Sequence, residues 1–416
     1  MTSREFHLNA DFDASLRGAK SLLETSDPTY LHEMAWHFLF AAAETDSLIV
    51  HRPLPPDFLV YLAGRGLGLP RIVLHPEFTP GSRFCPFGWT PQTEALSLRY
   101  AQPDAHPDLR IVQVANSRAF NLEVERGWGE AWGEARGQSK GKRAEREPPG
   151  YLFGALADLE NFLAARSEPL GWVIKGDHGH AGTGNRRVPS GALAEADRAP
   201  LAALFRDHGR VVAEPWHDRL LDMSVQFRVG KGGAISGFRG HVLLNSRDGA
   251  FLGVKILPGL RPPEPWDEVL EASAGELGRV LDDLGYFGPV SADAYVRNSP
   301  QGPRLRPVVD INARLSMALP AHGLADRLPG KSLLWMWSKP RKLNLPAPFT
   351  GYSDFEARLG AHAFDPDTRN GILAVSPLSI PGSGIRPKRV GFLFSADDEA
   401  GLARLQTAFA KALGRS

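Results

Sequence analysis

The sequence predicts an α/β protein with more than one domain. Three observations carry this prediction: the length of 416 residues, the alternation of short apolar strands with helices up to residue 74, and the charged residues that accompany later strands in 171–185 and 291–316. A chain of this length can form two or three domains, each with a hydrophobic core of its own.

The composition is that of an ordinary globular protein, with 43% hydrophobic residues and a formal net charge of +1. A balance this close to neutral argues against a protein that coats nucleic acid or binds membrane surfaces through charge. The single cysteine, Cys85, excludes an intramolecular disulfide framework and a cysteine zinc site. The first residues lack a signal segment, and the longest apolar run, 34–43, is too short to span a bilayer. We therefore expect a cytoplasmic protein without nucleic-acid or membrane partners.

Residues up to 115 are predicted to form a small parallel α/β domain. Strands at 47–50 and 71–74 flank a helix at 57–64, and this alternation is typical of parallel sheets. The other elements expected here are helices at 28–44 and 93–100 and a strand at 109–114.

Residues 127–150 are charged, rich in glycine and end in Pro-Pro, which predicts a loop or linker. The leucine spacing from residue 152 to 163 then predicts a helix. Alternation, turn signals and amphipathic spacing predict strands at 172–174, 211–214, 222–229, 290–296, 305–313, 371–375 and 389–394, a hairpin at 242–255, and helices at 266–284 and 397–413.

A glycine-rich loop follows the predicted strand at 172–174. Lys175 ends the strand, and the loop contains Gly176, Gly179, Gly182 and Gly184. Glycines at this density let backbone N–H groups close around an anion without interference from a Cβ atom, which indicates a nucleotide phosphate. The spacing matches neither the Walker loop nor the GxGxxG turn. A surface hairpin with a solvated lysine explains this stretch alone equally well.

Two aspartates form the strongest pattern in the chain. The turn at 299–303 predicts a hairpin, and a symmetric loop places Asp293 opposite Asp310 across the ladder. Facing carboxylates repel each other, and a bound Mg²⁺ removes that cost because this ion prefers oxygen ligands. The competing interpretation is a solvated sheet face whose register is shifted by a bulge.

The residues that follow Asp310 support the metal interpretation. Strand alternation puts Asn312 and Arg314 on the same face as Asp310. The amide of Asn312 adds an oxygen ligand, and the guanidinium of Arg314 can hold a phosphate or a carboxylate. We therefore favour a metal site over a solvated sheet face.

These residues, taken in order from Lys175 and its glycine loop to the segment Asp-Ile-Asn-Ala-Arg at 310–314, resemble the ATP-grasp superfamily over about residues 116–320. Its members are mostly carboxylate–amine or carboxylate–thiol ligases. The resemblance implies an ATP-grasp fold with a Rossmann-like pre-ATP-grasp domain in 1–115. It also implies a lid subdomain with the glycine-rich loop in 116–213, and a C-terminal subdomain with the metal site and the tail in 214–416.

The segment at 310–314 is similar to the E-x-N-x-R strand of the superfamily. The resemblance implies that Asp293, Asp310 and Asn312 are Mg²⁺ ligands and that Arg314 faces the phosphate or the activated intermediate. Both metal positions carry aspartate where glutamate is commoner, so these carboxylates reach about one methylene less far.

Three further positions match the nucleotide site of the superfamily. Lys175 matches the lysine that reaches the α-phosphate and the adenine side, Glu214 matches the hinge position before the adenine contacts, and Asp222 matches the acid on the ribose hydroxyls. The earlier lysine of the family is absent, and Arg118 is the nearest substitute. Arginine binds phosphate as a fork and not as a point charge, so this contact differs from the family pattern.

Four other polar residues lie near these motifs. His178 and His180 sit inside the glycine loop, where they contact the γ-phosphate or remain exposed. His241 and Lys255 follow Asp222 on strands where relatives place groups near phosphate or substrate, and a structural or solvated role is the alternative for both.

The resemblance implies a ligase that uses ATP and Mg²⁺ to convert a carboxylate into an acyl phosphate and joins it to an amine, such as an amino acid or peptide-like substrate, releasing ADP and phosphate. Arg314, Asp310 and Asn312 are then the catalytic set. The alternatives are a kinase-like phosphotransferase and an ATP-binding regulatory module without turnover. The resemblance leaves the two substrates open and allows a homodimer.

Overall fold

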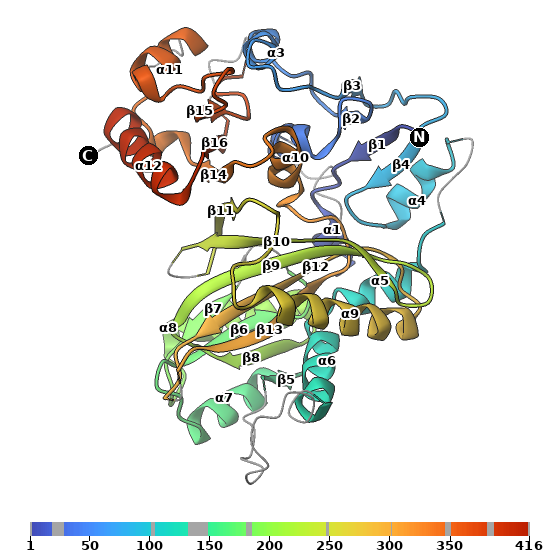
Figure 1. Ribbon diagram of the computed structural model, residues 1–416. Coiled ribbons are helices and arrows are strands. Elements are labelled where there is room, and N and C mark those ends of the chain that lie inside the picture. Colours follow the sequence, from blue (N-terminus) through green and yellow to red (C-terminus); the bar gives the residue numbers. More distant parts are fainter. Residues whose placement is uncertain are drawn as a thin grey trace.

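Three β-sheets organise the chain. The computed structural model describes residues 2–18, 29–100, 105–131, 149–179, 185–246, 249–300, 302–345, 351–380 and 387–414. Its strands form an N-terminal sheet of four strands, a middle sheet of four strands and a sheet of eight strands. In Figure 1 part of the eight-stranded sheet crosses the centre, below the N-terminal sheet and above the middle sheet, while its last strands lie at the upper left, level with the N-terminal sheet.

The N-terminal sheet is parallel throughout, in the order β3-β2-β1-β4, which confirms the parallel α/β arrangement predicted for these residues. The strand β1 is central, although the sequence pattern does not predict it. The predicted helix at 28–44 is shorter and is followed by a separate 3-10 helix. The elements are β1 (Arg4–His7), α1 (Phe12–Ser15), α2 (Thr29–Trp36), η2 (Leu39–Ala41), β2 (Ser47–Val50), α3 (Pro56–Ala63), β3 (Arg71–Leu74), β4 (Arg83–Pro86) and α4 (Pro91–Ser97).

The segment predicted as a strand at 109–114 is a helix, α5 (Leu109–Ala115), so that prediction is wrong. Its β-branched residues favour a strand locally. The side chain of Asp108, however, accepts a hydrogen bond from the N–H of Arg110 at 2.7 Å and caps the helix. Val112 and Ala115, three residues apart, are buried against the main core, which selects the helical spacing.

The helix α6 (Arg118–Ala131) extends into the stretch predicted as a linker at 127–150. It packs on β13 (Arg304–Asn312) of the eight-stranded sheet. The rest of that stretch, up to residue 148, lies outside the described residues. The segment that joins the predicted first and second domains is therefore anchored on the third sheet.

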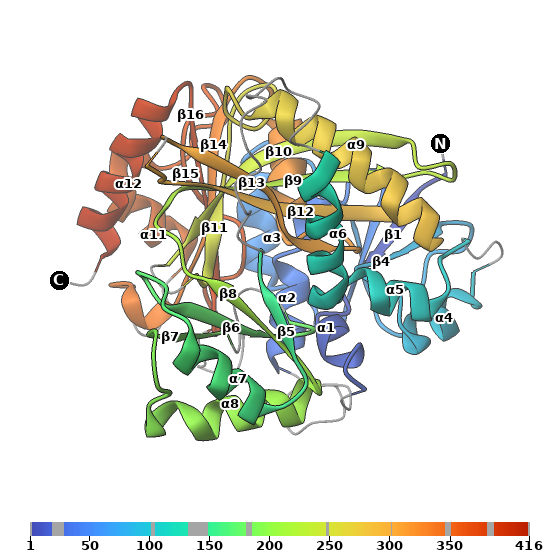
Figure 2. The same ribbon diagram turned by 90° about the horizontal axis from the view of Figure 1, so that it is seen from below.

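The middle sheet is antiparallel, in the order β5-β8-β6-β7. Residues 151–153 form a strand, so the helix predicted from residue 152 begins only at 156. The helices α7 and α8 lie along one side of this sheet (Figure 2), and their leucines form a small core with it. Its elements are β5 (Tyr151–Phe153), α7 (Leu156–Ala165), β6 (Trp172–Gly176), β7 (Arg186–Val188), α8 (Glu195–His208) and β8 (Val211–Pro215).

The side chains of β6 point alternately toward the helices and toward the open face of the middle sheet. Trp172 and Ile174 point into the small core beneath the helices. Val173 and Lys175 therefore point to the other side, where they line a cavity.

The eight-stranded sheet has the order β13-β12-β9-β10-β11-β14-β16-β15 and is antiparallel in every pairing. The predicted hairpin at 242–255 is confirmed, with Val242 paired to Lys255. The elements are β9 (Arg219–Val229), β10 (Ile235–Asn245), β11 (Phe251–Ile256), α9 (Asp267–Leu284), β12 (Gly288–Arg297), β13 (Arg304–Asn312), α10 (Leu319–Arg327), β14 (Ser332–Ser338), η3 (Pro340–Lys342), α11 (Tyr352–Leu359), η4 (Gly360–His362), β15 (Gly371–Ala374), β16 (Val390–Ala396) and α12 (Glu399–Leu413).

The C-terminal tail is part of this large sheet. The strands β14, β15 and β16 complete its far edge, and the aromatic side chains of β16 pack beneath α11 and α12. Within the described ranges, no helix combines the length and the apolar character needed to cross a membrane.

The β12–β13 hairpin explains why a simple register prediction succeeds at one point and fails at another. Near the turn, Arg297 pairs with Arg304, so the loop centre lies one residue earlier than predicted. An irregularity between Asp293 and Tyr295 then shifts the register by two residues. Asp293 therefore faces Asp310 as predicted, because the bulge compensates for the displaced turn.

The helix α10 packs on η2 and ties the large sheet to the N-terminal domain. A Cβ atom at Gly323 would lie 1.7 Å from the carbonyl oxygen of Phe40. We expect Gly323→Ala to lower the free energy of unfolding by about 1–3 kcal/mol, because neither backbone segment can yield without moving its helix.

The matched control for Gly323→Ala is Gly275→Ala in α9, where no atom lies within 4 Å of the added Cβ. This change should stabilise the protein by up to about 1 kcal/mol, since alanine is the better helix former. Thermal melting of both variants beside the wild type tests the packing, and equal melting temperatures would contradict it.

Candidate active site

A single cavity brings together most of the residues predicted to act. It lies where the open face of the middle sheet meets the eight-stranded sheet and the N-terminal domain. The predicted residues that line it are Arg118, Lys175, Asp222, Asp293, Asp310, Asn312 and Arg314. Glu214, Gly176 and Gly179 do not line it, and Gly182, Gly184 and His180 lie outside the described residues.

The facing aspartates form the electrostatic centre of the cavity. Asp310 is directly opposite Asp293 in the ladder. Burial, and then the charge of Asp310, raise the pKa of Asp293 to about 7. Ser224 on β9, which sequence reasoning missed, also pairs in register with Asp293, and its side chain opposes this rise through a hydrogen bond. The metal-free pair thus carries less negative charge than its composition indicates.

The donor set suits a hard divalent cation such as Mg²⁺. Two carboxylates and the amide of Asn312 provide oxygen ligands, and a cation between them would remove the repulsion that raises the pKa of Asp293. Across the described ranges, no cluster of three or more His, Cys, Asp or Glu side chains is placed to hold a metal. Asn312 or oxygen atoms of a bound ligand must therefore complete the coordination.

Arg314 is held on three sides at the end of β13. Its Nη2 donates to the Oδ1 of Asn312 at 2.9 Å and lies 3.6 Å from the Oδ2 of Asp13 in the N-terminal domain. Its guanidinium carbon lies 4.7 Å from the centre of the Phe87 ring. A buried arginine fixed in this way presents its positive charge to the cavity with little freedom to reorient.

Lys175 belongs to a buried chain of ion pairs. Its Nζ lies 2.9 Å from the Oε1 of Glu214, whose Oε2 accepts from the Nη1 of Arg306 at 2.8 Å. Arg306 also donates two hydrogen bonds to Glu125 on α6, at 2.7 and 3.0 Å. This network joins the middle sheet, β13 and α6, and two of its members, Arg306 and Glu125, were not predicted from the sequence.

The two carboxylates of this network differ because they share their cations unequally. Burial alone would raise the pKa of Glu214, but Lys175 and Arg306 together lower it to about 2. Burial raises the pKa of Glu125 to about 7, and the charge of Glu214 adds to this rise, although Arg306 and Lys175 oppose it. Glu214 is thus the ionised anchor that holds Lys175 in place.

Arg118 stands at the start of α6, between the glycine loop and the aspartates. Its Nη2 lies 3.4 Å from the Oδ2 of Asp310 and donates to the carbonyl oxygen of Gly179 at 3.4 Å, while its Nη1 donates to the carbonyl oxygen of Gly176. The predicted substitute for the missing lysine therefore does reach the site, as a buried fork that joins the loop to the carboxylate pair.

Comparisons of the sequence and of the structure with known proteins give different results. No protein-family model matches the sequence, and no curated protein is detectably similar to it. Solved structures do match over the full length. The N5-carboxyaminoimidazole synthetase of Staphylococcus aureus, complexed with ADP, superposes with a TM-score of 0.53 at 12% identity, over 98% of this chain and 97% of the other.

Two other solved structures with different names also match. The biotin carboxylase domain dimer of the 2-oxoglutarate carboxylase from Hydrogenobacter thermophilus, in complex with MgADP, ADP and bicarbonate, has a TM-score of 0.51 at 10% identity, over 100% of this chain and 91% of the other. The L-amino acid ligase of Bacillus licheniformis has a TM-score of 0.50 at 13% identity, over 99% and 98%. The chain has an ATP-grasp fold.

Within this ATP-grasp fold, two glycines of the loop are required for close packing. A Cβ atom at Gly176 would lie 2.5 Å from the ring of His208, and one at Gly179 would lie 3.1 Å from the Nη1 of Arg118. Larger side chains at these two positions would collide with α8 or press against Arg118. The Nε2 of His178 donates to the carbonyl oxygen of Gln113 at 3.1 Å, and His178 does not line the cavity.

The predicted ribose acid, Asp222, belongs to a stack of side chains that the sequence did not reveal. Its Oδ1 accepts from the Nη1 of Arg219 at 3.0 Å. The guanidinium of Arg219 in turn lies over the rings of Trp216 and Tyr295, at 5.2 and 4.5 Å. Trp216 follows Glu214 by two residues, and this spacing after the hinge was the signal that could have identified it.

The two remaining candidates, His241 and Lys255, lie in different environments. His241 lines the cavity and is buried, whereas Lys255 pairs with Glu399 at 2.8 Å on the surface and lies outside it. Of these two residues, only His241 is placed where it could contact a ligand in the cavity.

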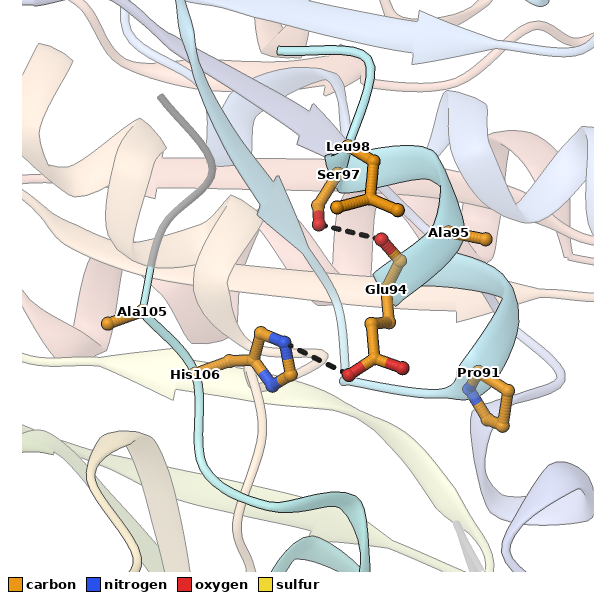
Figure 3. Close-up of a pocket in the computed structure, with 7 residues that line it drawn as sticks. All are labelled: Pro91, Glu94, Ala95, Ser97, Leu98, Ala105 and His106. Carbon is orange, nitrogen blue, oxygen red and sulfur yellow. Dashed lines mark hydrogen bonds and ion pairs between the residues drawn. The ribbon is translucent and has the colours of Figure 1, made fainter. Parts of the chain in front are cut away.

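A second cavity lies on the N-terminal domain beside α4. Figure 3 shows His106 directed at the carboxylate of Glu94, where its Nε2 lies 3.3 Å from Oε1. The hydroxyl of Ser97 donates to the carbonyl oxygen of Glu94 at 2.7 Å. These polar groups satisfy one another, so this cavity offers no charge arrangement comparable to that of the candidate active site.

Proposed function

We propose that this protein is an ATP- and Mg²⁺-dependent ligase that activates a carboxylate as an acyl phosphate and joins it to an amine. One observation carries the proposal: a cavity in an ATP-grasp fold holds two facing carboxylates beside Lys175, Arg118 and Arg314. Such a mixture of acidic metal ligands and fixed cations suits a triphosphate and its metal. The structural neighbours, which include a synthetase and an L-amino acid ligase, support the same class.

In the first step, a carboxylate oxygen of the substrate attacks the γ-phosphorus of ATP. The bond from that phosphorus to the β,γ-bridging oxygen breaks, which yields an acyl phosphate and ADP. Arg118 and Arg314 hold fixed positive charge at the cavity wall, where negative charge is redistributed in the transition state. Mg²⁺ bound by Asp293, Asp310 and Asn312 would supply further positive charge to the phosphates.

In the second step, the amine nitrogen attacks the acyl carbon. The carbon–oxygen bond to phosphate breaks, and phosphate and one proton leave as the amide forms. The protein provides no nucleophile, since the phosphate already activates the carbonyl. Its contribution is to orient the substrates and to exclude the water that would hydrolyse the acyl phosphate.

The test of this proposal is a screen of small carboxylic acids and amino acids, singly and in pairs, for ADP release. We expect ADP formation that depends on Mg²⁺ and on an added acid, with phosphate as the second product. Stoichiometric AMP and pyrophosphate would exclude the acyl-phosphate mechanism. A phosphorylated acceptor without amide would favour the kinase-like alternative, and tight ATP binding without turnover would favour the regulatory module.

Lys175 tests the nucleotide site without any knowledge of the substrates. We expect Lys175→Met to weaken MgATP binding by about 1.5–3 kcal/mol, the contribution of a hydrogen bond to a charged group, which corresponds to about 10- to 150-fold in Kd. The fold should persist, because Glu214 keeps its ion pair with Arg306. Titration calorimetry measures the affinity and thermal melting checks the fold.

The matched control for Lys175→Met is Lys255→Met, which removes a lysine ion pair outside the cavity. Its nucleotide affinity should equal that of the wild type. Equal affinities of the two variants would show that Lys175 serves only the internal ion-pair network.

A further inference from the structure

The cavity extends well beyond the carboxylate pair. Asp293 and Asp310 stand on β12 and β13, whereas Phe251, Trp337 and Arg389 line the same cavity from β11, β14 and the start of β16. The strands β9, β10 and β11 lie between β12 and β14 in the sheet order. The C-terminal tail therefore forms a wall of the cavity that is distinct from the metal end.

Arg389 provides a positive charge in this wall of the cavity. Its guanidinium carbon lies 5.0 Å from the centre of the Trp337 ring. Among the residues that the structure describes, no carboxylate lies within ion-pair distance of it. Asp13, an acid that lines the cavity from the N-terminal domain, is instead 3.6 Å from Arg314. A half-buried guanidinium stacked on an indole and lining a cavity can accept an anion from outside the protein.

Two other cavity-lining side chains have unused polar atoms. Trp337 is 7% exposed, and its indole N–H is buried without a hydrogen-bond partner. His241 is 1% exposed; its Nδ1 lies 3.1 Å from the Nε2 of His322, while its own Nε2 has no partner. Both residues line the cavity, and buried polar groups are normally satisfied, so a ligand that reaches these atoms would supply partners that the described residues do not.

The polar and apolar groups of this wall indicate which class of ligand it can bind. The guanidinium and the indole N–H both donate, so they require acceptor oxygens, and a carboxylate matches the planar fork of an arginine. The rings of Phe251 and Trp337 meet edge to face at 5.5 Å, and Met34 adds an apolar side chain. Apolar walls beside a few convergent polar groups are typical of small-molecule sites and favour an apolar ligand body.

We propose that Arg389 and Trp337 form a subsite for a substrate that carries an anchoring carboxylate on an aromatic or other apolar body. This proposal rests on the ligase function proposed above and names the class of one of its substrates. Because several strands separate the subsite from Asp293 and Asp310, the anchored carboxylate is not the one that receives the phosphoryl group. An amine substrate with a free carboxylate, such as an apolar amino acid, meets this description.

Binding of 3-phenylpropionate and L-phenylalanine to the full-length protein tests the subsite by titration calorimetry, with and without MgADP. We expect at least one of these acids to bind the wild type, and 3-phenylpropan-1-ol, which lacks the carboxylate, to bind at least about tenfold more weakly. Arg389→Gln should weaken the acid by a similar factor. Arg389→Lys, which keeps the charge but not the fork, should retain part of the affinity.

The control variant is Arg404→Gln, which removes an exposed arginine of α12 outside the cavity and should bind the acids like the wild type. Failure of both acids to bind with and without nucleotide would overturn the proposal, as would equal binding by wild type and Arg389→Gln. Preferential binding of phenyl phosphate would assign the subsite to a phosphate instead. Since no turnover is needed, these outcomes are independent of the Lys175 test, which alone decides the nucleotide site.

Discussion

Replacing Asp310 with asparagine should lower Mg²⁺-dependent turnover by about 100-fold or more, the effect expected when a principal electrostatic group of an active site is removed. The change keeps the size of the side chain but removes one of the two facing carboxylates and with it half of the negative charge that would hold the cation. The stabilisation of the protein by MgATP should disappear, because a ligand that no longer binds the native state cannot raise its stability.

The same variant should leave the stability of the metal-free protein within about 1 kcal/mol of the wild type, the range of partly exposed ion pairs. Two effects oppose each other here. Asp310→Asn removes the repulsion that helps raise the pKa of Asp293, and it also removes the attraction to Arg118 at 3.4 Å. Melting curves without and with MgATP measure the stability of the metal-free protein and the shift that MgATP produces.

Asp326→Asn is the matched control, since its carboxylate pairs with Arg239 on the surface and lies outside the cavity. It should keep both turnover and the MgATP-induced shift. A strong loss of metal-free stability in Asp310→Asn together with an undiminished MgATP shift would show that Asp310 is a structural residue.

Arg306→Met should lower the free energy of unfolding by about 3–5 kcal/mol, because it leaves Glu125 and Glu214 buried without their shared partner. Nucleotide affinity should fall as well. Without Arg306, the negative charge of Glu214 is balanced by Lys175 alone, and that lysine is then held more tightly away from a ligand.

The control for Arg306→Met is Arg304→Met, two residues earlier on the same strand and exposed. It should change stability by less than about 0.5 kcal/mol, as surface substitutions usually do. The double variant with Glu125→Gln should recover part of the loss, since one of the two orphaned carboxylates is removed. Denaturant unfolding measures all three proteins, and equal stability of the two methionine variants would contradict a buried network.

Part of the site was predictable because the relevant residues are close in sequence. Strand alternation alone places Asp310 and Asn312 on one face, and Arg314 lines the same cavity two residues beyond the end of β13. The hairpin that brings Asp293 opposite Asp310 spans only a short turn, although the bulge that sets its final register left no trace in the pattern. Lys175 was identified because it ends a buried strand before a glycine-rich loop.

Local preference failed where tertiary packing outweighed it. The β-branched run at 109–114 predicts a strand, yet α5 forms because Val112 and Ala115 bury helically spaced faces in the main core. The local pattern predicts that a helix begins at the short β5. The strand forms because these residues pair with β8, about sixty positions away in the chain. Sequence periodicity carries no information about such partners.

The sequence by itself therefore determined the α/β class, the parallel N-terminal domain, the order of most later strands and the carboxylate pair, all of which depend on spacing within one element or one hairpin. Only the tertiary structure decided which distant residues meet them. Arg306 reaches Glu125 and Glu214, and Trp337 and Arg389 reach the cavity, through contacts between elements far apart in the chain. Such contacts arise from the packing of sheets and helices around common cores, and no local pattern of residues encodes them.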